Sequence, residues 1–534
     1  MNSTKNSNIH VRIGTRGSEL ALWQARFTQS LLENHGISSS LTIIKTKGDL
    51  THHLSFDKIE GKGFFTKEIE DALLAGEVDL AVHSCKDMPT ADTEGLLLSA
   101  YSARVNPADI LLIHPSAYDT SQLLSLRPNA VVATSSSRRK NQILALRPDM
   151  SCTEIRGNVP TRIQKLRDGI ADATVLAAAG LERLQCDISG LYAVPLAAPM
   201  CIPAPAQGIL AYQIRKGDDA MMAVSRLLDD AHSRQIIAIE RQLLHAFGGG
   251  CQVPIGIYAQ QDGHGVHTWI SYAKAASDMP LRRHYYFSDN ETPNIAAIVS
   301  DITTPHKEKS VFISRTIHSD EYLYRILHSN GYSIQGQSCI DFAPVHFDTS
   351  EIAEGDILFF SSKNGFHYFE SSLEDKSFLH RCRLAAINTG TALYIRSRGY
   401  LTAFEGKDSH TEKIGEDLMR FYAATASSSR IWFLGARHSL RSIQHHIPEA
   451  IVGDIVVYEN RPSTHIAKSN ADIMVFTSPM NVRAYTALYT FEAYQKLIAI
   501  GGSTAATLES FAPQYNVAFA PTPWSLADSI MSVS

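Results

Sequence analysis

Short apolar runs alternate with amphipathic stretches over the first 215 residues. Runs rich in Val, Ile and Leu predict strands at 10–16, 41–46, 79–84, 110–114, 130–134 and 173–180. Residues 20–36 and 64–76 carry apolar side chains at helical spacing and end in glycine, as many helices do. Strands that alternate with helices are typical of an α/β fold, and we expect a mainly parallel sheet.

The segment 188–214 has no charged residue and is long enough to cross a bilayer. Its prolines at 195, 199, 203 and 205 argue against a membrane helix, because each removes a backbone donor and clashes with the preceding turn. We expect an extended, mostly buried crossing between two domains. A helix at 233–247 and a strand at 253–259 then indicate a smaller α+β domain that ends near residue 305.

A second α/β series follows a polar linker. Its apolar runs predict strands at 311–315, 356–362, 383–389, 430–436, 455–461, 473–479 and 497–503. The stretches that begin at Asp356 and Asp472 resemble each other, since each has an acidic residue, an apolar strand, a Ser/Thr turn and an aromatic-bearing helix. This duplication predicts two lobes, and a cleft between lobes is the usual ligand site.

Composition describes a folded chain of several domains. At about 150 residues per domain, 534 residues predict three to four domains, and 44% of them are hydrophobic. The net charge of −5 argues against a nonspecific nucleic-acid binder, so any anion site must be local. Seven cysteines without a CxxC pair and an N-terminus without an apolar stretch favour free thiols in a cytoplasmic protein.

Two groups of polar residues lie at predicted turns. Cys251 follows three glycines, which allow a tight loop tip with the thiol open to a cleft. An incidental cysteine in a flexible turn is the alternative. Lys86 and Asp87 follow the strand at 79–84, at the carboxyl end where open parallel sheets bind ligands. A capping or turn aspartate before a proline would explain Asp87 as well.

Basic side chains recur in four groups on strand-end loops. The groups are Arg12 with Arg16, Lys58 with Lys62, Arg138 with Arg139, and Arg156 with Arg162. The serine-rich turn before Arg138 adds hydroxyl groups and amides, and guanidinium groups bind carboxylates or phosphates through paired hydrogen bonds. Solvated surface charges are the alternative. Nucleic acid is a rival anion, which the net charge and the lack of aromatic stacking motifs disfavour.

Eight motifs, in order and at compatible spacing, resemble hydroxymethylbilane synthase, also called porphobilinogen deaminase. They are RIGTRGSELALWQA (12–25), KTKGD (45–49), GKGFFTKEIE (61–70), DLAVHSCKDMP (79–89), TSSSRR (134–139), IRGNVPTRIQKL (155–166), PAPAQGIL (203–210) and GGGCQVPIG (248–256). The chain departs from the family at Ala206, where glycine is common, at Ser137, where leucine is usual, and at Pro160.

The resemblance implies two periplasmic-binding-protein-like domains and a small α+β domain. Their expected ranges are 1–104 plus 197–222, 105–196, and 223–305. It further implies that Cys251 carries a dipyrromethane cofactor through a thioether, as the primer for substrate pyrroles. Asp87 matches the catalytic aspartate, which assists loss of ammonia from porphobilinogen and stabilises the positive azafulvene. Residues matched to the cofactor are Lys86, Ser84, Arg138, Arg139 and Ser136; those matched to substrate carboxylates are Arg16, Arg156, Arg162, Lys58 and Lys62.

Residues from about 310 onward resemble uroporphyrinogen-III synthase. The resemblance rests on VVYENRP (456–462), VFTSPMNVRAY (475–485) and AIGGSTAATLESF (499–511). It implies two Rossmann-like lobes joined by a two-strand linker, 308–342 plus 463–534 and 346–456. Tyr458 matches a tyrosine that helps to expel the terminal hydroxyl as water. The turn residues expected to donate hydrogen bonds to substrate carboxylates are Thr477, Ser478, Ser503 and Thr504.

The sequence thus predicts a bifunctional enzyme of tetrapyrrole and heme synthesis. One half condenses four porphobilinogens into hydroxymethylbilane with release of ammonia, and the other cyclises that bilane with inversion of the last ring. We expect a monomer without metal, nucleic acid or membrane partner. Two alternatives stay open: a deaminase whose C-terminal half only binds product or stabilises the chain, and a two-domain solute-binding protein.

Overall fold

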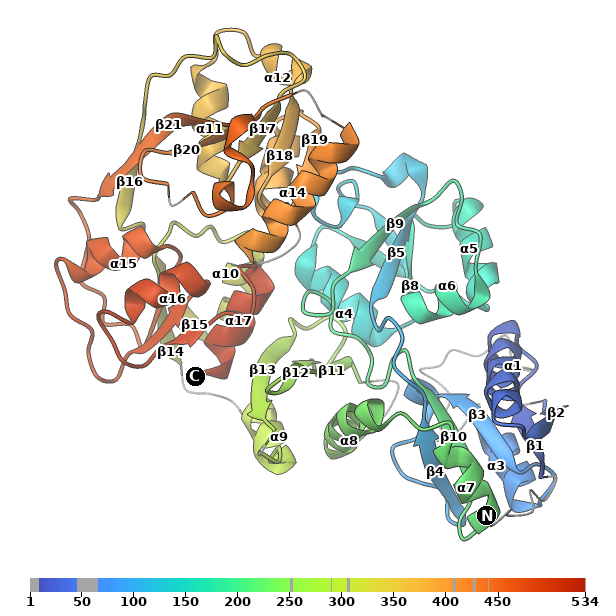
Figure 1. The fold of residues 1–534 in the computed structure, drawn as a ribbon. Coiled ribbons are helices and arrows are strands. Elements are labelled where there is room, and N and C mark those ends of the chain that lie inside the picture. Colours follow the sequence, from blue (N-terminus) through green and yellow to red (C-terminus); the bar gives the residue numbers. More distant parts are fainter. Residues whose placement is uncertain are drawn as a thin grey trace, which may run out of the picture. The chain divides into compact units, whose positions relative to one another are not determined.

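The computed structural model describes residues 9–45, 66–249, 253–289, 291–304, 308–406, 410–425, 429–439 and 441–533. The chain divides into two compact units, 1–118 with 128–306 and 119–127 with 307–534. Within the described ranges the strands form five sheets, three in the first unit and two in the second (Figure 1). The fold is therefore mixed α/β with several sheets, as the alternation of strands and helices predicted.

The first sheet has the strand order β2-β1-β3-β10-β4. Its strands are β1 (His10–Thr15), β2 (Ser38–Ile43), β3 (Leu80–Ser84), β4 (Leu96–Tyr101) and β10 (Leu210–Arg215). Its helices are α1 (Glu19–Asn34), α3 (Lys67–Leu74) and α7 (Asp219–Arg226). β1 pairs parallel with β2 and β3, whereas β10 pairs antiparallel with β3 and β4.

The second sheet has the strand order β7-β6-β8-β5-β9. Its strands are β5 (Asp109–Ile113), β6 (Val131–Ala133), β7 (Ser151–Thr153), β8 (Ala173–Ala177) and β9 (Tyr192–Leu196). The helices are α4 (Ser137–Leu146), α5 (Val159–Arg167) and α6 (Ala178–Leu184), with the one-turn helix η3 (Pro115–Ala117) after β5. The next one-turn helix, η4 (Leu123–Ser125), belongs to the second unit. The predicted strand at 173–180 ends early, because α6 begins at Ala178.

The expectation of a mainly parallel sheet is wrong for both sheets. β5 pairs antiparallel with β8 and β9, and β10 pairs antiparallel with both of its neighbours. The chain leaves the first sheet after β4 and comes back to it only at β10. A strand that returns from another sheet can enter against the direction of its neighbours, which a period-two apolar pattern does not reveal.

The crossing between the two sheets is irregular and mostly buried, as predicted. Residues 200–203 and 205–210 are buried between β9 and β10. Ile202 N donates a 2.6 Å hydrogen bond to Gln142 Oε1 of α4, and Ile257 N donates to Pro203 O at 3.1 Å. Of the helices in the described ranges, none is long and apolar enough to cross a membrane.

A three-stranded antiparallel sheet completes the first unit. It consists of β11 (Ile255–Gln261), β12 (Gly265–Tyr272) and β13 (Leu281–Ser288). Helices α8 (Ala231–Ala246) and α9 (Ile295–Thr303) share its core with Ile257 and Ile270, through Leu243, Ile298 and Ile302. The predicted helix at 233–247 and the following strand are confirmed.

One sheet of the second unit, together with its helices, is called lobe 1. Its order is β15-β14-β22-β23-β24, and all its pairs are parallel. The strands are β14 (Lys309–Ile313), β15 (Tyr332–Gly336), β22 (Ile473–Phe476), β23 (Lys496–Ala499) and β24 (Asn516–Val517). The helices are α10 (Tyr322–Ser329), α15 (Pro479–Thr486), α16 (Gly502–Leu508) and α17 (Pro523–Ser532).

The other sheet of this unit, with its helices, is called lobe 2. Its order is β16-β21-β20-β17-β18-β19, and β16 alone pairs antiparallel. The strands are β16 (Ile340–Pro344), β17 (Ile357–Phe360), β18 (Arg383–Ala386), β19 (Thr402–Glu405), β20 (Ile431–Ala436) and β21 (Val452–Pro462). The helices are α11 (Lys363–Ser372), α12 (Phe378–Arg381), α13 (Thr389–Ser397) and α14 (Thr411–Thr425), with one-turn helices η5 (Gln444–His446) and η6 (Glu449–Ile451).

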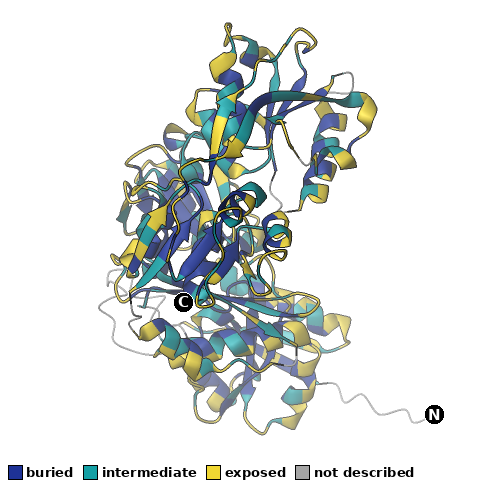
Figure 2. Ribbon diagram, turned by 90° about the vertical axis from the view of Figure 1, so that its left-hand side faces the viewer, coloured by how far each residue is buried: buried dark blue, intermediate teal, exposed yellow. Residues whose placement is uncertain are grey.

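Two apolar clusters cover the faces of the lobe 2 sheet. One joins the sheet to α11, α12 and α13 through Phe366, Leu379 and Ile395, and the other joins it to α14 through Ile414 and Leu418. Figure 2 shows the strands as the buried elements and the outer helix faces as exposed. The duplicated stretches predicted from the sequence form the equivalent units β17–α11 and β22–α15.

Candidate functional site

Ser84, Lys86 and Asp87 lie together at the carboxyl end of β3. Ser84 is the last residue of the strand, and Lys86 and Asp87 belong to the one-turn helix η2 (Cys85–Asp87). Asp87 is exposed, whereas Lys86 is half-buried. The buried Gln24 of α1 donates a 2.8 Å hydrogen bond to Ser84 Oγ. Sequence reasoning did not single out Gln24, although it belongs to the motif at 12–25, because its contact with Ser84 depends on how α1 packs on the sheet.

Arg138 and Arg139 begin α4 and share one carboxylate. Arg138 and Arg139 are 6% and 7% exposed, and Asp109 is fully buried. Arg138 Nη1 lies 2.9 Å from Asp109 Oδ2, and Arg139 Nη2 lies 2.6 Å from Oδ1. Burial alone would raise the pKa of Asp109, but the two guanidinium groups outweigh burial and hold this pKa well below its usual value. Ser136 caps the same helix, since its Oγ accepts a hydrogen bond from Arg139 N.

Cations outnumber carboxylates around this pair. Burial lowers the pKa of Lys86, the charges of Arg139 and Arg138 act in the same direction, and Asp87 opposes them. Burial and the charge of Arg139 also lower the pKa of Arg162 to about 10. Lys86 from the first sheet therefore lies close to the arginines of the second. Lys86, Arg138 and Arg139 thus interact with Asp87 and Asp109, and Arg162 adds a fourth positive charge beside Arg139, so the set carries a net positive charge.

The other predicted basic residues are placed separately. Arg16 follows β1 and is half-buried, and Arg156 lies 3.7 Å from Glu154 Oε2. The neighbouring Arg12 pairs with Asp79 at 2.8 Å. Cys251, Lys58 and Lys62 lie outside the described residues.

Lobe 1 has a topological switch point at the centre of its sheet. From β14 the chain moves outward to β15, and from β22 it moves the other way to β23, so the ends of β14 and β22 form a topological switch point. Thr477 lies there, and its backbone N donates a 2.8 Å hydrogen bond to Ser314 Oγ. Ser478 caps α15 and accepts from Asn481 N at 3.2 Å. On α16, Ser503 is exposed and Thr504 is buried.

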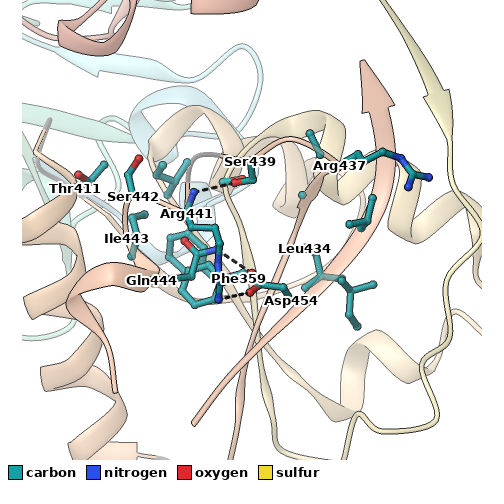
Figure 3. A pocket seen from close by; sticks show the side chains of 17 residues that line it. Phe359, Thr411, Leu434, Arg437, Ser439, Arg441, Ser442, Ile443, Gln444 and Asp454 are labelled. Carbon is teal, nitrogen blue, oxygen red and sulfur yellow. Dashed lines mark hydrogen bonds and ion pairs between the residues drawn. The ribbon is translucent and has the colours of Figure 1, made fainter. Parts of the chain in front are cut away.

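Lobe 2 has the corresponding switch point between β17 and β20, and a pocket of about 380 Å³ opens there (Figure 3). Phe359 and Phe433 give it an apolar floor, and Ser361, Arg437 and Arg441 bring polar groups to it. Sequence reasoning missed this pocket because its lining comes from several separate segments, which only the packing of the sheet brings together.

Tyr458 lies on the opposite face of the lobe 2 sheet, against α11. Its hydroxyl group lies 3.2 Å from Ser362 Oγ, and its ring stacks on Tyr368 at 5.5 Å between centroids. The side chain is buried, and this burial raises the pKa of Tyr458. The strand pairing of β21 with β20 shifts register opposite Gly435 and Ala436. This shift interrupts the alternation of side chains between the two faces of the sheet, and Tyr458 therefore points to the face of α11.

Family models match both units of the chain. The model described as "Porphobilinogen deaminase, dipyromethane cofactor binding domain" matches residues 11–223. The model described as "Porphobilinogen deaminase, C-terminal domain" matches residues 235–270. In the second unit, the model described as "Uroporphyrinogen-III synthase HemD" matches residues 323–528.

Similar proteins include porphobilinogen deaminases of two bacteria. The protein of a Nitratiruptor species is 47% identical over 251 residues, which are 47% of this chain and 79% of the relative. That of Nitratidesulfovibrio vulgaris is 45% identical over 48% of this chain and 80% of its own length. The crystal structure of uroporphyrinogen-III synthetase from Helicobacter pylori 26695 is 19% identical, with a TM-score of 0.31, and covers 42% of this chain and 100% of that one.

Deaminase domains and a uroporphyrinogen-III synthase domain are thus present in one polypeptide, which makes it a bifunctional enzyme of tetrapyrrole biosynthesis. With a relative that is 47% identical over 79% of that relative's length, the chain belongs to the porphobilinogen deaminase family.

Proposed function

We propose that the residues between β3 and α4 carry out the deaminase reaction, the condensation of four porphobilinogens into hydroxymethylbilane with release of ammonia. The observation that carries this assignment is an excess of cations over carboxylates: Lys86, Arg138, Arg139 and Arg162 form one set with the buried Asp109 and the exposed Asp87. Each pyrrole brings two carboxylates, so the growing chain needs fixed cations. Arginine suits that role, because its planar guanidinium group remains charged and binds carboxylates through two hydrogen bonds.

Asp87 is the proposed catalytic residue. It donates a proton to the amine that leaves porphobilinogen as ammonia, and its carboxylate then stabilises the positive charge that develops on the substrate. The exposed position of Asp87 at the end of β3 supports this role, because the carboxyl group is accessible to a substrate held by the neighbouring cations.

The residues present fit a cofactor that bears carboxylates, because the set has more cations than acids. We propose that Cys251 is the attachment point of dipyrromethane, which supplies, when bound, a primer for the incoming pyrroles. The residues proposed to hold the carboxylates of this group are Lys86, Ser84, Arg138, Arg139 and Ser136. Those proposed to bind substrate carboxylates are Arg16, Arg156 and Arg162, with Lys58 and Lys62.

Mass spectrometry of the denatured full chain tests the attachment. The parent should carry the added mass of a dipyrromethane, whereas Cys251→Ser should show the bare polypeptide and lose deaminase activity. Cys152→Ser on β7 is the matched control and should keep both the added mass and the activity. Full turnover by Cys251→Ser would overturn the assignment. A bare parent without deaminase activity would favour a solute-binding protein instead.

We propose that the second unit cyclises hydroxymethylbilane to uroporphyrinogen III, with Tyr458 assisting loss of the terminal hydroxyl as water. Thr477, Ser478, Ser503 and Thr504 are proposed to donate hydrogen bonds to substrate carboxylates. The contacts of Tyr458 with Ser362 and of Thr477 with Ser314, each at a sheet's carboxyl edge, support this assignment.

Supplying hydroxymethylbilane to the full chain tests the second activity. The parent should form isomer III. Tyr458→Phe should shift the product toward isomer I, the spontaneous product, while its deaminase activity stays unchanged and reports correct folding of the first unit. A parent that forms only isomer I from supplied bilane would favour the monofunctional alternative, in which the C-terminal half only binds or stabilises.

We further propose the division into two periplasmic-binding-protein-like domains, a small α+β domain and two Rossmann-like lobes, with the ranges expected from the sequence. Four of the five sheets lie inside one expected range each, and this agreement supports the division. The antiparallel pair β16 and β21 spans the boundary between the lobes, as a two-strand linker would. A monomer in the cytoplasm is part of the same proposal, and the free thiols of the described cysteines are compatible with a reducing compartment.

A further inference from the structure

The pocket of lobe 2 contains an ion pair between Arg441 and Asp454, to which no role has been assigned above. We propose that Arg441 determines specificity in this lobe by binding a carboxylate side chain of the linear tetrapyrrole, in exchange for its ion pair with Asp454. The inference rests on the proposed function of the second unit and adds the residue and the substrate group that it recognises.

The pocket suits a pyrrole ring that carries a carboxylate. Its volume of about 380 Å³ lies within the range of small-molecule sites, and its floor consists of side chains such as Phe359, Phe433 and Ile443. An apolar floor with a charged group at its edge matches a flat ring with an acidic substituent. The position at the switch point between β17 and β20 is where open α/β sheets bind ligands.

Arg441 and Asp454 form an ion pair that another carboxylate can replace. Arg441 Nη2 lies 2.7 Å from Asp454 Oδ2, and the side chains are 51% and 38% exposed. Ion pairs at such exposure contribute little net stability, so an exchange of one carboxylate for another costs little. Gln444 Nε2 donates a 2.9 Å hydrogen bond to Asp454 Oδ1, which holds the aspartate on β21 when Arg441 turns to a ligand.

The backbone of Arg441 holds its side chain at the pocket. Its φ of 53° lies in the left-handed region, which arginine rarely adopts. Two hydrogen bonds fix this conformation, from Arg441 N to Ser439 Oγ at 3.4 Å and from His445 N to Arg441 O at 3.2 Å. Strained backbone of this kind clusters at ligand sites. Figure 3 shows Arg441, Gln444 and Asp454 gathered together and Arg437 apart from them.

The rim of the pocket also carries more positive than negative charge. Arg437 Nε lies 3.2 Å from Glu459 Oε2, and Arg461 contacts the same glutamate. Glu459 and Arg461 lie outside the lining, so the charged side chains that line the pocket are two arginines, Arg437 and Arg441, and one carboxylate, Asp454. A substrate carboxylate would neutralise this excess, whereas a neutral or cationic ligand would not.

Steady-state kinetics of the full chain with supplied hydroxymethylbilane test the proposal. Arg441→Gln should raise KM for the bilane by about tenfold, as expected for loss of a hydrogen bond to a charged group. Arg441→Lys should recover part of that loss. Asp454→Asn should lower KM about twofold to fivefold, because it removes the competing carboxylate. If the ion pair had only a structural role, Asp454→Asn would raise KM, because Asp454→Asn and Arg441→Gln both break the pair.

Two controls belong to the same experiment. Arg420→Gln removes an exposed arginine that pairs with Asp417 on α14, outside the pocket, and should leave KM unchanged. Deaminase activity should be equal in all variants, which reports correct folding of the first unit, and an unchanged kcat for the supplied bilane reports correct folding of the second unit. An unchanged KM in Arg441→Gln, or an equal rise in KM for Arg441→Gln and Asp454→Asn, would overturn the inference alone. A parent that forms only isomer I would overturn the proposed function of this unit and the inference with it.

Discussion

Arg138 and Arg139 illustrate how burial changes the role of a charged residue. Both are nearly inaccessible and both bind Asp109, so part of their charge serves to hold the second sheet, α4 and the crossing together. Each guanidinium group has five N–H donors, so pairing with one carboxylate leaves donors for a ligand. The same two arginines can therefore stabilise the fold and bind substrate or cofactor carboxylates.

Replacing Asp109 should show how much its ion pairs with Arg138 and Arg139 contribute to the stability of the first unit. Asp109→Asn leaves two buried cations without their counter-ion, and we expect a loss of about 3 to 5 kcal/mol in the free energy of unfolding of the first unit. Denaturant unfolding of the full chain measures this loss. Asp187→Asn is the control, because Asp187 pairs with Arg167 on the exposed surface at 3.1 Å, where the loss should stay below about 1 kcal/mol. A loss for Asp109→Asn as small as that of the control would contradict this assignment.

His83 should make the first unit less stable in mild acid. The residue is buried on β3, and this burial lowers its pKa to about 4; Arg16 acts in the same direction and Gln213 opposes them. The unfolded chain, with a histidine pKa of about 6.5, binds a proton between pH 6.5 and 4 that the folded chain excludes. Stability is therefore complete above pH 6.5 and falls as pH decreases through this window, by at most about 1.4 kcal/mol per pH unit.

Urea unfolding of the parent and of His83→Gln between pH 7.5 and 4.5 measures this effect. The variant should lose part of the slope of stability against pH. It should not lose all of it, because burial also lowers the pKa of His284, to about 3. The exposed His438→Gln should keep the parent slope. Identical slopes in the parent and His83→Gln would show that His83 does not stay neutral in the folded protein.

At the scale of elements, the crossing before β10 depends on backbone conformations that side chains disfavour. Ala206 has a φ of 61° and is 2% exposed, so the chain accepts a left-handed alanine where its family commonly has glycine. Gly208, two residues later, has a φ of 92°, and a Cβ atom there would lie 2.6 Å from Val105 O. The crossing therefore tolerates a methyl group at one position and excludes it at the other.

Gly208→Ala should lower the free energy of unfolding of the first unit by more than the cost of a left-handed alanine alone. The left-handed conformation alone costs an alanine about 1 to 2 kcal/mol, and the clash with Val105 O adds to that cost. Gly169→Ala is the matched control, since Gly169 has a φ of 76° but nothing lies within 4 Å of the position that a Cβ atom would take. The midpoint of denaturant unfolding should fall further for Gly208→Ala. Equal shifts in the two variants would show that the crossing can move away from Val105.

The strand β21 contributes side chains to the lobe 2 pocket and to the surroundings of Tyr458 because its strand pairing contains one register shift. Asp454 and Val456 line the pocket, whereas Tyr458 packs against Tyr368 of α11 on the other face. Strict alternation would place all three side chains on the same face, and the register shift after Gly435 prevents this. The pocket and the tyrosine therefore lie on different faces of one sheet.

At the scale of the whole molecule, each unit completes its own sheets and cores, so the two activities are linked by covalent connection. Hydroxymethylbilane cyclises spontaneously to the wrong isomer, and a tethered second site raises the local concentration of the enzyme that intercepts it. We expect the intact chain to keep a high fraction of isomer III when it is diluted.

An equimolar mixture of Asp87→Asn and Tyr458→Phe chains provides the comparison, because it contains one active site of each kind on separate molecules. Starting from porphobilinogen, the mixture should lose isomer III as the protein concentration falls, and the parent should not. Chromatographic separation of the two isomers measures the ratio. Equal ratios at every dilution would show that the bilane reaches the second site by free diffusion.

Local pattern was sufficient for many strands and for the place of the candidate catalytic aspartate, but it missed strands such as β4, β12 and β19. Apolar periodicity located strands such as β3, β17 and β22, and the motif around Asp87 placed it at the end of β3, where the structure has it. The duplicated stretches also predicted equivalent strand–helix units correctly. These features depend on neighbours within one or two turns of the chain, and a sequence records such neighbours directly.

The sequence by itself determined the family, the alternation of strands and helices in both units, and the residue types available for carboxylate binding. Only the tertiary structure decided the direction of β5 and β10, the partnership of Arg139 with Asp109 across 30 residues, and the meeting of Arg441 with Asp454 in a pocket. The physical reason is that strand direction and long-range ion pairs follow from how separate elements pack. That packing is a property of the assembled core, which no local stretch of sequence contains.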